Sequence, residues 1–181
     1  MNRCAPLVLL GALAFSATAP SITAWAQELQ VTTGTATVID ANHLDVAGKR
    51  FKLYGIDAPD TDETCQTAKG VEYPCGIEAR DALMKLVAPG EVSCLPRGPN
   101  ALNETMAICT IGQTDIARAL TEAGWALADR ARTLYYEDPE LTARTAKRGI
   151  WQGKFVSPDA WRIGERVPPS GHGAAIPEVP Q

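Results

Sequence analysis

Residues 29–56 constrain the fold most, because they predict three short β-strands in immediate succession. Valine and threonine at alternate positions lead up to residue 39, a pattern that is typical of a strand. A second short strand follows at 43–46, and a tight turn at 47–49 leads into a third strand at 50–56. The sequence therefore predicts a three-stranded meander at the start of the fold.

Three helices are expected further along the chain. Apolar residues recur near helical spacing across 77–87, and a second helical stretch covers 115–123 and ends at a glycine. A third helix is expected from 138 to 149, with Asp138 as its N-cap and Pro139 at the first helical position.

Two more strands lie between these helices, at 91–95 and 105–111. Each of them carries one cysteine. Five strands, with helices after the third and the fifth and a last helix at the end, predict an α+β, mainly β fold: a five-stranded OB-type barrel with three helices.

Residues 1–26 read as an export signal that is not part of the fold. A positively charged start precedes an apolar run at 7–15, which is shorter than the ~20 residues that span a bilayer. A small-x-small site ends at Ala26, so we expect cleavage there and a periplasmic or secreted protein without a membrane anchor. The folded domain would then cover 27–163, and the tail at 164–181, rich in proline and glycine, is expected to be disordered.

Four cysteines remain after the signal, namely Cys65, Cys75, Cys94 and Cys109. An even number in an exported chain indicates two disulfides, although four cysteines allow three pairings. We favour nearest-neighbour pairing, which would let Cys94 and Cys109 join neighbouring strands. The alternative, a structural zinc site, would need C-x-x-C spacing that the sequence lacks.

The charge balance is acidic, with 17 lysines and arginines against 21 aspartates and glutamates and a formal net charge of −4. Phosphate binding depends on an excess of basic residues, so this balance disfavours nucleic acid as a partner. The acidic excess falls on the predicted barrel. We interpret the basic residues near the end of the domain as a solvated helix face; they are Arg130, Arg132, Arg144, Lys147 and Arg148.

Local motifs appear in a fixed order along the mature chain: Val38-Ile39-Asp40, then Lys52 to Asp60, Gly124-Trp125-Ala126 and Arg148-Gly149-Ile150-Trp151. In type and spacing they resemble the thermonuclease (staphylococcal nuclease-like) family, across residues 35–161. The pieces around Cys65 and Cys75 are similar to those of the exported, four-cysteine members that are common in bacteria.

The resemblance implies an activity and a site. Members of the family cleave phosphodiesters of DNA and RNA with calcium, which two aspartates and a backbone carbonyl hold as oxygen ligands. A glutamate acts near the attacking water. Two arginines clamp the phosphate through charged contacts that strengthen in the transition state.

Carried over to this chain, the metal positions are only partly kept. The first metal aspartate corresponds to Asn42, which retains an oxygen but loses a charge, and the second to Asp57, with Ala58 offering its carbonyl. Asp40 or Asp45 could compensate for Asn42 as a ligand, and Asp40 is the better candidate because strand alternation would direct Asp45 elsewhere. Calcium is the only cofactor that the resemblance implies, and we expect its binding to be weak or lost.

The catalytic positions are all substituted. Lys52 stands at the first arginine, and a lysine cannot form the planar fork of a guanidinium. Asp60 stands at the glutamate and is one methylene shorter. Glu104 stands at the second arginine, which reverses the sign of the contact with a phosphate. In a shifted register, Arg97 would be the nearest upstream basic residue.

His43 lies beside these positions. It is either a strand-start residue without a chemical role or, with Asp57 nearby, a general base or a ligand of a transition metal.

We therefore expect an exported thermonuclease-like protein that is non-hydrolytic or strongly impaired and acts as a binding or accessory module. One alternative is an active, calcium-dependent secreted nuclease that tolerates the substitutions. A second alternative is an accessory factor in exopolysaccharide (succinoglycan-type) or envelope biosynthesis, with envelope or exopolysaccharide components as partners. This last alternative rests on family association alone, because no residue selects a carbohydrate ligand.

Overall fold

The computed structural model describes residues 30–88 and 90–168. The expected signal segment and residues 169–181 of the expected tail lie outside the described residues. Within the described ranges, no helix has both the length and the apolar character needed to cross a membrane.

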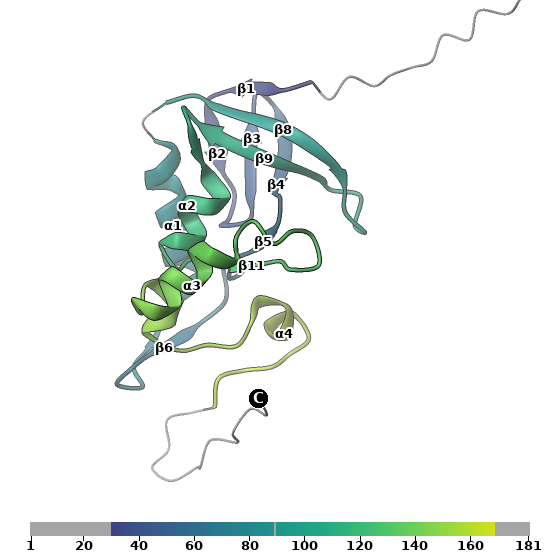
Figure 1. The fold of residues 1–181 in the computed structure, drawn as a ribbon. Coiled ribbons are helices and arrows are strands. Elements are labelled where there is room, and N and C mark those ends of the chain that lie inside the picture. Colours follow the sequence, from purple (N-terminus) through teal and green to yellow (C-terminus); the bar gives the residue numbers. More distant parts are fainter. Residues whose placement is uncertain (1–29, 89, 169–181) are drawn as a thin grey trace, which may run out of the picture.

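The main sheet confirms the predicted α+β, mainly β fold. Its strands follow the order β1-β8-β9-β4-β3-β2, with β10 paired to β9. Their bounds are Thr32–Gly34 (β1), Ala36–Val38 (β2), His43–Val46 (β3), Lys49–Leu53 (β4), Val92–Pro99 (β8), Thr105–Ile111 (β9) and Thr114–Asp115 (β10). The two ends of this order, β1 and β2, are separated in the chain only by Thr35. The sheet therefore curls back on one chain segment, as Figure 1 shows.

The sheet differs in detail from the five strands expected. The first strand is divided at Thr35, so that β1 pairs with β8 and β2 pairs with β3. Two small sheets lie beside the main one. They consist of β5 (Ile56–Asp57) with β11 (Leu127–Ala128), and of β6 (Cys65–Thr67) between β7 (Glu72–Tyr73) and β12 (Gly153–Lys154). These two- and three-residue strands are too short to show a hydrophobic period in the sequence.

The meander places one face of β3 and β4 in the core and the other face outward. Leu44 and Phe51, paired in register, are buried, because alternate side chains of a strand point to opposite faces. His43 and Lys52 are the neighbouring pair in register, on the outward face, and they are only partly buried. The predicted tight turn is formed at 47–49, where Ala47 and Gly48 both have positive φ. This register sets His43 opposite Lys52 at the edge of the candidate site.

The helices are α1 (Cys75–Val87), α2 (Ile116–Glu122), α3 (Glu137–Thr145) and α4 (Pro158–Arg162), with a 3₁₀ turn, η1, at Gly149–Gln152. Four α-helices in the described part of the chain replace the three expected. The expected bounds of the third helix were wrong. It begins at Glu137 with Tyr136 as N-cap residue, so neither Asp138 nor Pro139 has the role that the sequence suggested. It ends at Thr145, because Lys147 adopts positive φ and turns the chain.

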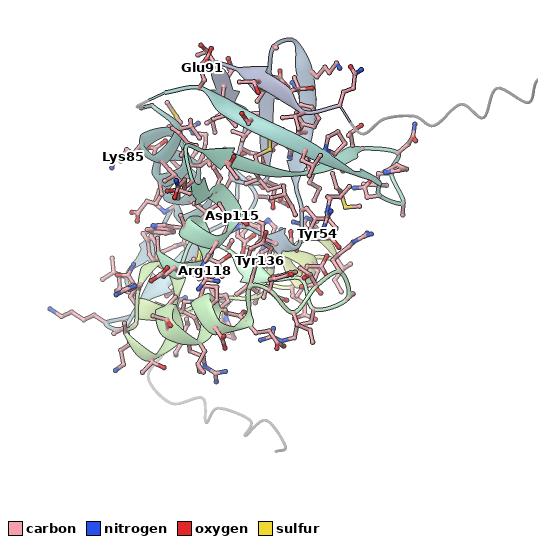
Figure 2. The ribbon with its side chains drawn as sticks, turned by 45° about the horizontal axis from the view of Figure 1, so that its top comes forward. Tyr54, Lys85, Glu91, Asp115, Arg118 and Tyr136 are labelled. Carbon is pink, nitrogen blue, oxygen red and sulfur yellow. A yellow bond between two sulfur atoms is a disulfide. The ribbon has the colours of Figure 1, made fainter. Side chains whose placement is uncertain are left out.

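The second helix is present as predicted, and Asp115 caps it and also fastens it to α3. Its Oδ1 accepts a hydrogen bond from the backbone N–H of Arg118, and its Oδ2 accepts one from the Tyr136 hydroxyl. Figure 2 shows these three residues close together between the sheet and the lower helices. The contact holds Tyr136, and with it the start of α3, against the barrel.

Two motif glycines are required by a close approach of backbones. A Cβ on Gly124 would lie 2.3 Å from the Arg148 carbonyl oxygen, and a Cβ on Gly149 would lie 2.2 Å from the Gly124 carbonyl oxygen. The Ile150 N–H donates to that same Gly124 oxygen at 3.0 Å. The two motifs thus form a single contact that joins the end of α2 to the turn after α3.

Both disulfides have the nearest-neighbour pairing that the sequence favoured. Cys94 and Cys109 are register partners on β8 and β9, and their disulfide joins these two neighbouring strands. Cys65 on β6 is bonded to Cys75 at the start of α1. All four cysteines are fully buried, so the disulfides are part of the core.

Candidate functional site

A cleft of about 390 Å³ lies beside β4, β5 and β11, and residues of α4 line one of its walls. Its charged lining consists of four cationic and three acidic residues, namely Lys52, Arg130, Arg132, Arg162, Asp57, Asp129 and Asp159. The structure thus brings two of the predicted site residues, Lys52 and Asp57, to one cleft. Asn100 and Met106, which flank Glu104 on the β8–β9 hairpin, line it as well.

Asn42 is held by the backbone of Ala58. Its side-chain Nδ2 donates to the Ala58 carbonyl oxygen at 2.8 Å, and its Oδ1 accepts from the Ala58 N–H at 2.9 Å. The residue is only 1% exposed. This reciprocal pair requires an amide, because an ionised carboxylate has no proton to donate to the carbonyl. The side-chain oxygen of Asn42 and the carbonyl of Ala58 are therefore engaged with each other.

Arg162 of α4 lies between the other two predicted acidic positions. Its Nη1 and Nη2 donate to the Asp57 carboxylate at 2.9 and 2.6 Å, and its Nε and Nη2 donate to the Asp60 carboxylate at 2.8 and 3.2 Å. Hydrogen bonding to Asp57 raises the pKa of the Arg162 guanidinium above its ordinary value, although partial burial of the side chain acts in the opposite direction. Two carboxylates and one guanidinium form a charge-assisted cluster.

Sequence reasoning did not find Arg162. The only local signal is Ser157-Pro158, a residue type favoured as an N-cap followed by a proline at the first helical position, which indicates a short helix there. No spacing rule connects that helix to Asp57, because 105 residues separate them.

A second charged cluster forms at the position of the family's second arginine. The Nδ1 of His43 lies 2.9 Å from the Asp40 carboxylate, and its Nε2 lies 3.2 Å from Oε1 of Glu104. The second contact is too poorly aligned to be a hydrogen bond. His43 thus connects two of the predicted site residues, and within the described residues it forms no hydrogen bond or ion pair with Asp57.

The surroundings keep both carboxylates of this cluster ionised. Asn100 donates a hydrogen bond to Glu104 at 2.6 Å; this bond, with the charges of His43 and Lys52, lowers the pKa of Glu104. Burial acts to raise the pKa of Asp40, but hydrogen bonding and the charge of His43 outweigh it and hold that pKa below its ordinary value.

Glu63, which the sequence analysis missed, lies beneath Asp60. Its Oε2 accepts the Asp60 backbone N–H at 3.2 Å, while its Oε1 is buried and has no hydrogen-bond partner within the described ranges. Burial raises the pKa of Glu63 to about 7. Its carboxylate lies within 4.8 Å of the Cys65 and Cys75 sulfurs, but those atoms are bonded to each other and are not thiolates that could bind a metal.

Three further arginines have roles that the sequence did not indicate. Arg130 and Arg132 were expected on a solvated helix face, but they lie in the segment between β11 and α3 and line the cleft. Arg130 forms ion pairs with Glu137 and Glu140. Arg97 lies over the Tyr54 ring, 5.7 Å from its centroid.

The curled β sheet is covered by helices and has a charged cleft beside β4. Together these features define a thermonuclease-like fold. The model of the staphylococcal nuclease homologue family matches residues 50–153. The chain belongs to this family. It is similar to the succinoglycan biosynthesis protein ExoI of Rhizobium meliloti (strain 1021), with 31% identity over 134 residues that cover 72% of this chain and 70% of that protein.

Proposed function

We propose that this chain is a non-hydrolytic member of its family, with a binding or accessory role in place of phosphodiester cleavage. The observation that carries the proposal is the reciprocal pair between Asn42 and Ala58. The resemblance assigns a calcium ligand to each of these residues, and both oxygens accept an N–H from the protein.

The remaining oxygen donors are also engaged by other groups of the chain. The Asp57 carboxylate is bound on both oxygens by Arg162, and Asp40 accepts from the Asn42 N–H and from His43. A hard divalent cation needs several free oxygen ligands, preferably charged ones. A calcium ion here would have to break a hydrogen bond or an ion pair for each ligand that it gained.

The phosphate side of the site supports the same proposal. Glu104 stands at an arginine position with its carboxylate ionised, and Lys52 beside it supplies only a point charge. Loss of one charged donor to the developing negative charge removes about 3–4 kcal/mol of transition-state stabilisation, which is a factor of 10² to 10³ in rate. A carboxylate in its place adds repulsion.

The relative's name favours a second, more specific candidate, an accessory role in exopolysaccharide assembly outside the cytoplasm. That protein is named for succinoglycan biosynthesis. Two disulfides are compatible with export, since they persist in oxidising compartments. We propose a mature chain that begins after Ala26, with its domain at 27–163.

A nuclease assay tests the non-hydrolytic proposal. The chain from residue 27 onward is incubated with single-stranded DNA and millimolar calcium, beside a sample with EDTA. We expect no calcium-dependent cleavage above the EDTA sample. The variant with both Asn42→Asp and Glu104→Arg should gain measurable activity. Cleavage by the unsubstituted chain at ordinary nuclease rates, abolished by EDTA, would contradict the proposal.

A further inference from the structure

The C-terminal segment of the described chain runs across the candidate site. After β12 pairs with β6, the chain turns into α4, which lies apart from α1, α2 and α3 and close to β5 and β11 (Figure 1). Near its end, the Gln66 side chain donates to the Pro168 carbonyl oxygen at 3.1 Å. We call residues 155–168 the C-terminal strap.

The main polar contact of this strap with the site is the Arg162 fork. Four of the five N–H donors of a guanidinium are used on Asp57 and Asp60. One donor remains, too few for bidentate binding of an anionic ligand. Arg162 therefore acts as a fixed counter-charge for the two carboxylates.

We propose that the C-terminal strap is an autoinhibitory element, in which Arg162 competes with divalent cations for Asp57 and Asp60. This inference goes beyond the proposed loss of hydrolysis. It states that the acidic pair is able to bind a cation and is masked by the chain's own guanidinium. Asn42 and Glu104 would still prevent cleavage after the strap had moved.

The strap is weakly enough held to be displaced. Its helix has five residues and no side chain caps its N-terminus in the described structure. The Arg162 side chain is 38% exposed, and its partners Asp57 and Asp60 are 23% and 34% exposed, so solvent and salt screen the ion pairs. Trp161 is buried, but Arg166 of the same strap covers its ring at 3.5 Å from the centroid. That stacking lies within the strap and moves with it.

Release of Arg162 leaves two carboxylates without a positive partner and so favours binding of a cation. Asp57 and Asp60 lie close enough to share one guanidinium and would repel each other without it. The carboxylate of Glu63 lies beneath them, and the positive charge of Arg162 also favours its ionised form by lowering its pKa against the effect of burial. A divalent cation would replace the lost positive charge at the place where it is needed.

The test compares two charge-removing substitutions in the same strap. Arg162→Gln removes the fork, and Arg166→Gln is the matched control, because Arg166 contacts the backbone of Trp161 and Glu165 but neither carboxylate. Both are made in the chain from residue 27 onward, and circular dichroism confirms that they fold. Isothermal titration calorimetry then measures binding of Ca²⁺ and Tb³⁺.

We expect Arg162→Gln to bind both cations at least tenfold more tightly than the unsubstituted chain, and Arg166→Gln to bind as the unsubstituted chain does. Adding Asp57→Asn to Arg162→Gln should remove the gain. Hydrogen exchange of the strap gives an independent readout: exchange should be fast in Arg162→Gln without cation, and millimolar calcium should accelerate it in the unsubstituted chain.

Equal cation affinity in Arg162→Gln and in the unsubstituted chain would overturn the inference, and so would an equal gain in Arg166→Gln. Neither result depends on nuclease activity. Failure of this inference is therefore distinct from failure of the proposed function, which only the cleavage assay decides.

Discussion

Replacement of Asn42 by aspartate should destabilise the protein, although it changes one side-chain nitrogen to oxygen. Asn42 is 1% exposed, and its Nδ2 donates to the Ala58 carbonyl oxygen at 2.8 Å. An aspartate there places a carboxylate oxygen against that carbonyl with no proton between them. The change thus removes one buried hydrogen bond and leaves a carbonyl unsatisfied beside a negative charge.

The magnitude follows from these two effects. The net loss of one hydrogen bond removes about 1 kcal/mol, and an unsatisfied buried acceptor adds about 1–3 kcal/mol. We expect the free energy of unfolding to fall by about 2–4 kcal/mol at pH 7. For a domain of this size that is a decrease in Tm on the order of 10 °C.

The loss should also depend on pH, in a direction that the geometry sets. Burial beside a carbonyl raises the folded-state pKa of the new carboxyl above its unfolded value. Below that folded pKa, the protonated carboxyl donates its O–H to Ala58 and the deficit shrinks. The deficit should therefore be full at pH 7 and smaller near pH 4.

Urea unfolding in EDTA measures the change at both pH values. Asn103→Asp is the matched control, because Asn103 is exposed and adopts a positive φ that aspartate also tolerates; its change should stay within about 0.5 kcal/mol. Equal stability of Asn42→Asp and Asn103→Asp at pH 7 would mean that the hydrogen bonds between Asn42 and Ala58 contribute little. The proposed function would then lose its main support.

Two further stability predictions follow from buried contacts. Burial raises the pKa of Glu63 from 4.5 to about 7, so its protonated form stabilises the fold fully below pH 4.5, and this contribution is lost as the pH rises through 7. The free energy of unfolding should thus fall between pH 5 and pH 8 in the unsubstituted chain and in the exposed control Glu91→Gln. The fall should be smaller in Glu63→Gln. An equal fall in all three proteins would contradict this role of Glu63. Gly149→Ala should destabilise by more than about 3 kcal/mol, because its Cβ would lie 2.2 Å from the Gly124 oxygen, whereas Gly112→Ala, with similar positive φ and open space, should lose only the smaller backbone strain. Thermal unfolding of both variants measures the difference, and similar Tm values would refute the contact.

Local signals predicted most of the fold. Valine and threonine alternation and turn residues predicted the strands that became β1 to β4, and apolar spacing predicted the helix that became α2. Local signals failed where a tertiary contact competed with them. The third helix starts at Glu137, since Tyr136 is held by Asp115 from another helix, and an N-cap preference at Asp138 could not reveal that contact.

The candidate site divides in the same way. The motif spacing identified Asn42, Asp57 and Lys52, and a comparison of residue types was enough to notice their altered charges. It did not show that Asn42 pairs with Ala58, since the orientation of an amide depends on the neighbouring strand. Arg130 and Arg132 were assigned to a helix face, although they lie in the loop between β11 and α3, and only the tertiary structure brings that loop to the cleft.

The sequence by itself determined the family, the order of the main elements and the favoured cysteine pairing, because turn chemistry, side-chain period and motif spacing act between near neighbours in the chain. Only the tertiary structure decided which charges meet. Arg162 reaches Asp60 across 102 residues, and that contact exists because β12 pairs with β6 and directs α4 to the cleft. The guanidinium of Arg162 therefore stands where a metal cation would be expected because of a long-range contact. No local sequence pattern encodes that contact.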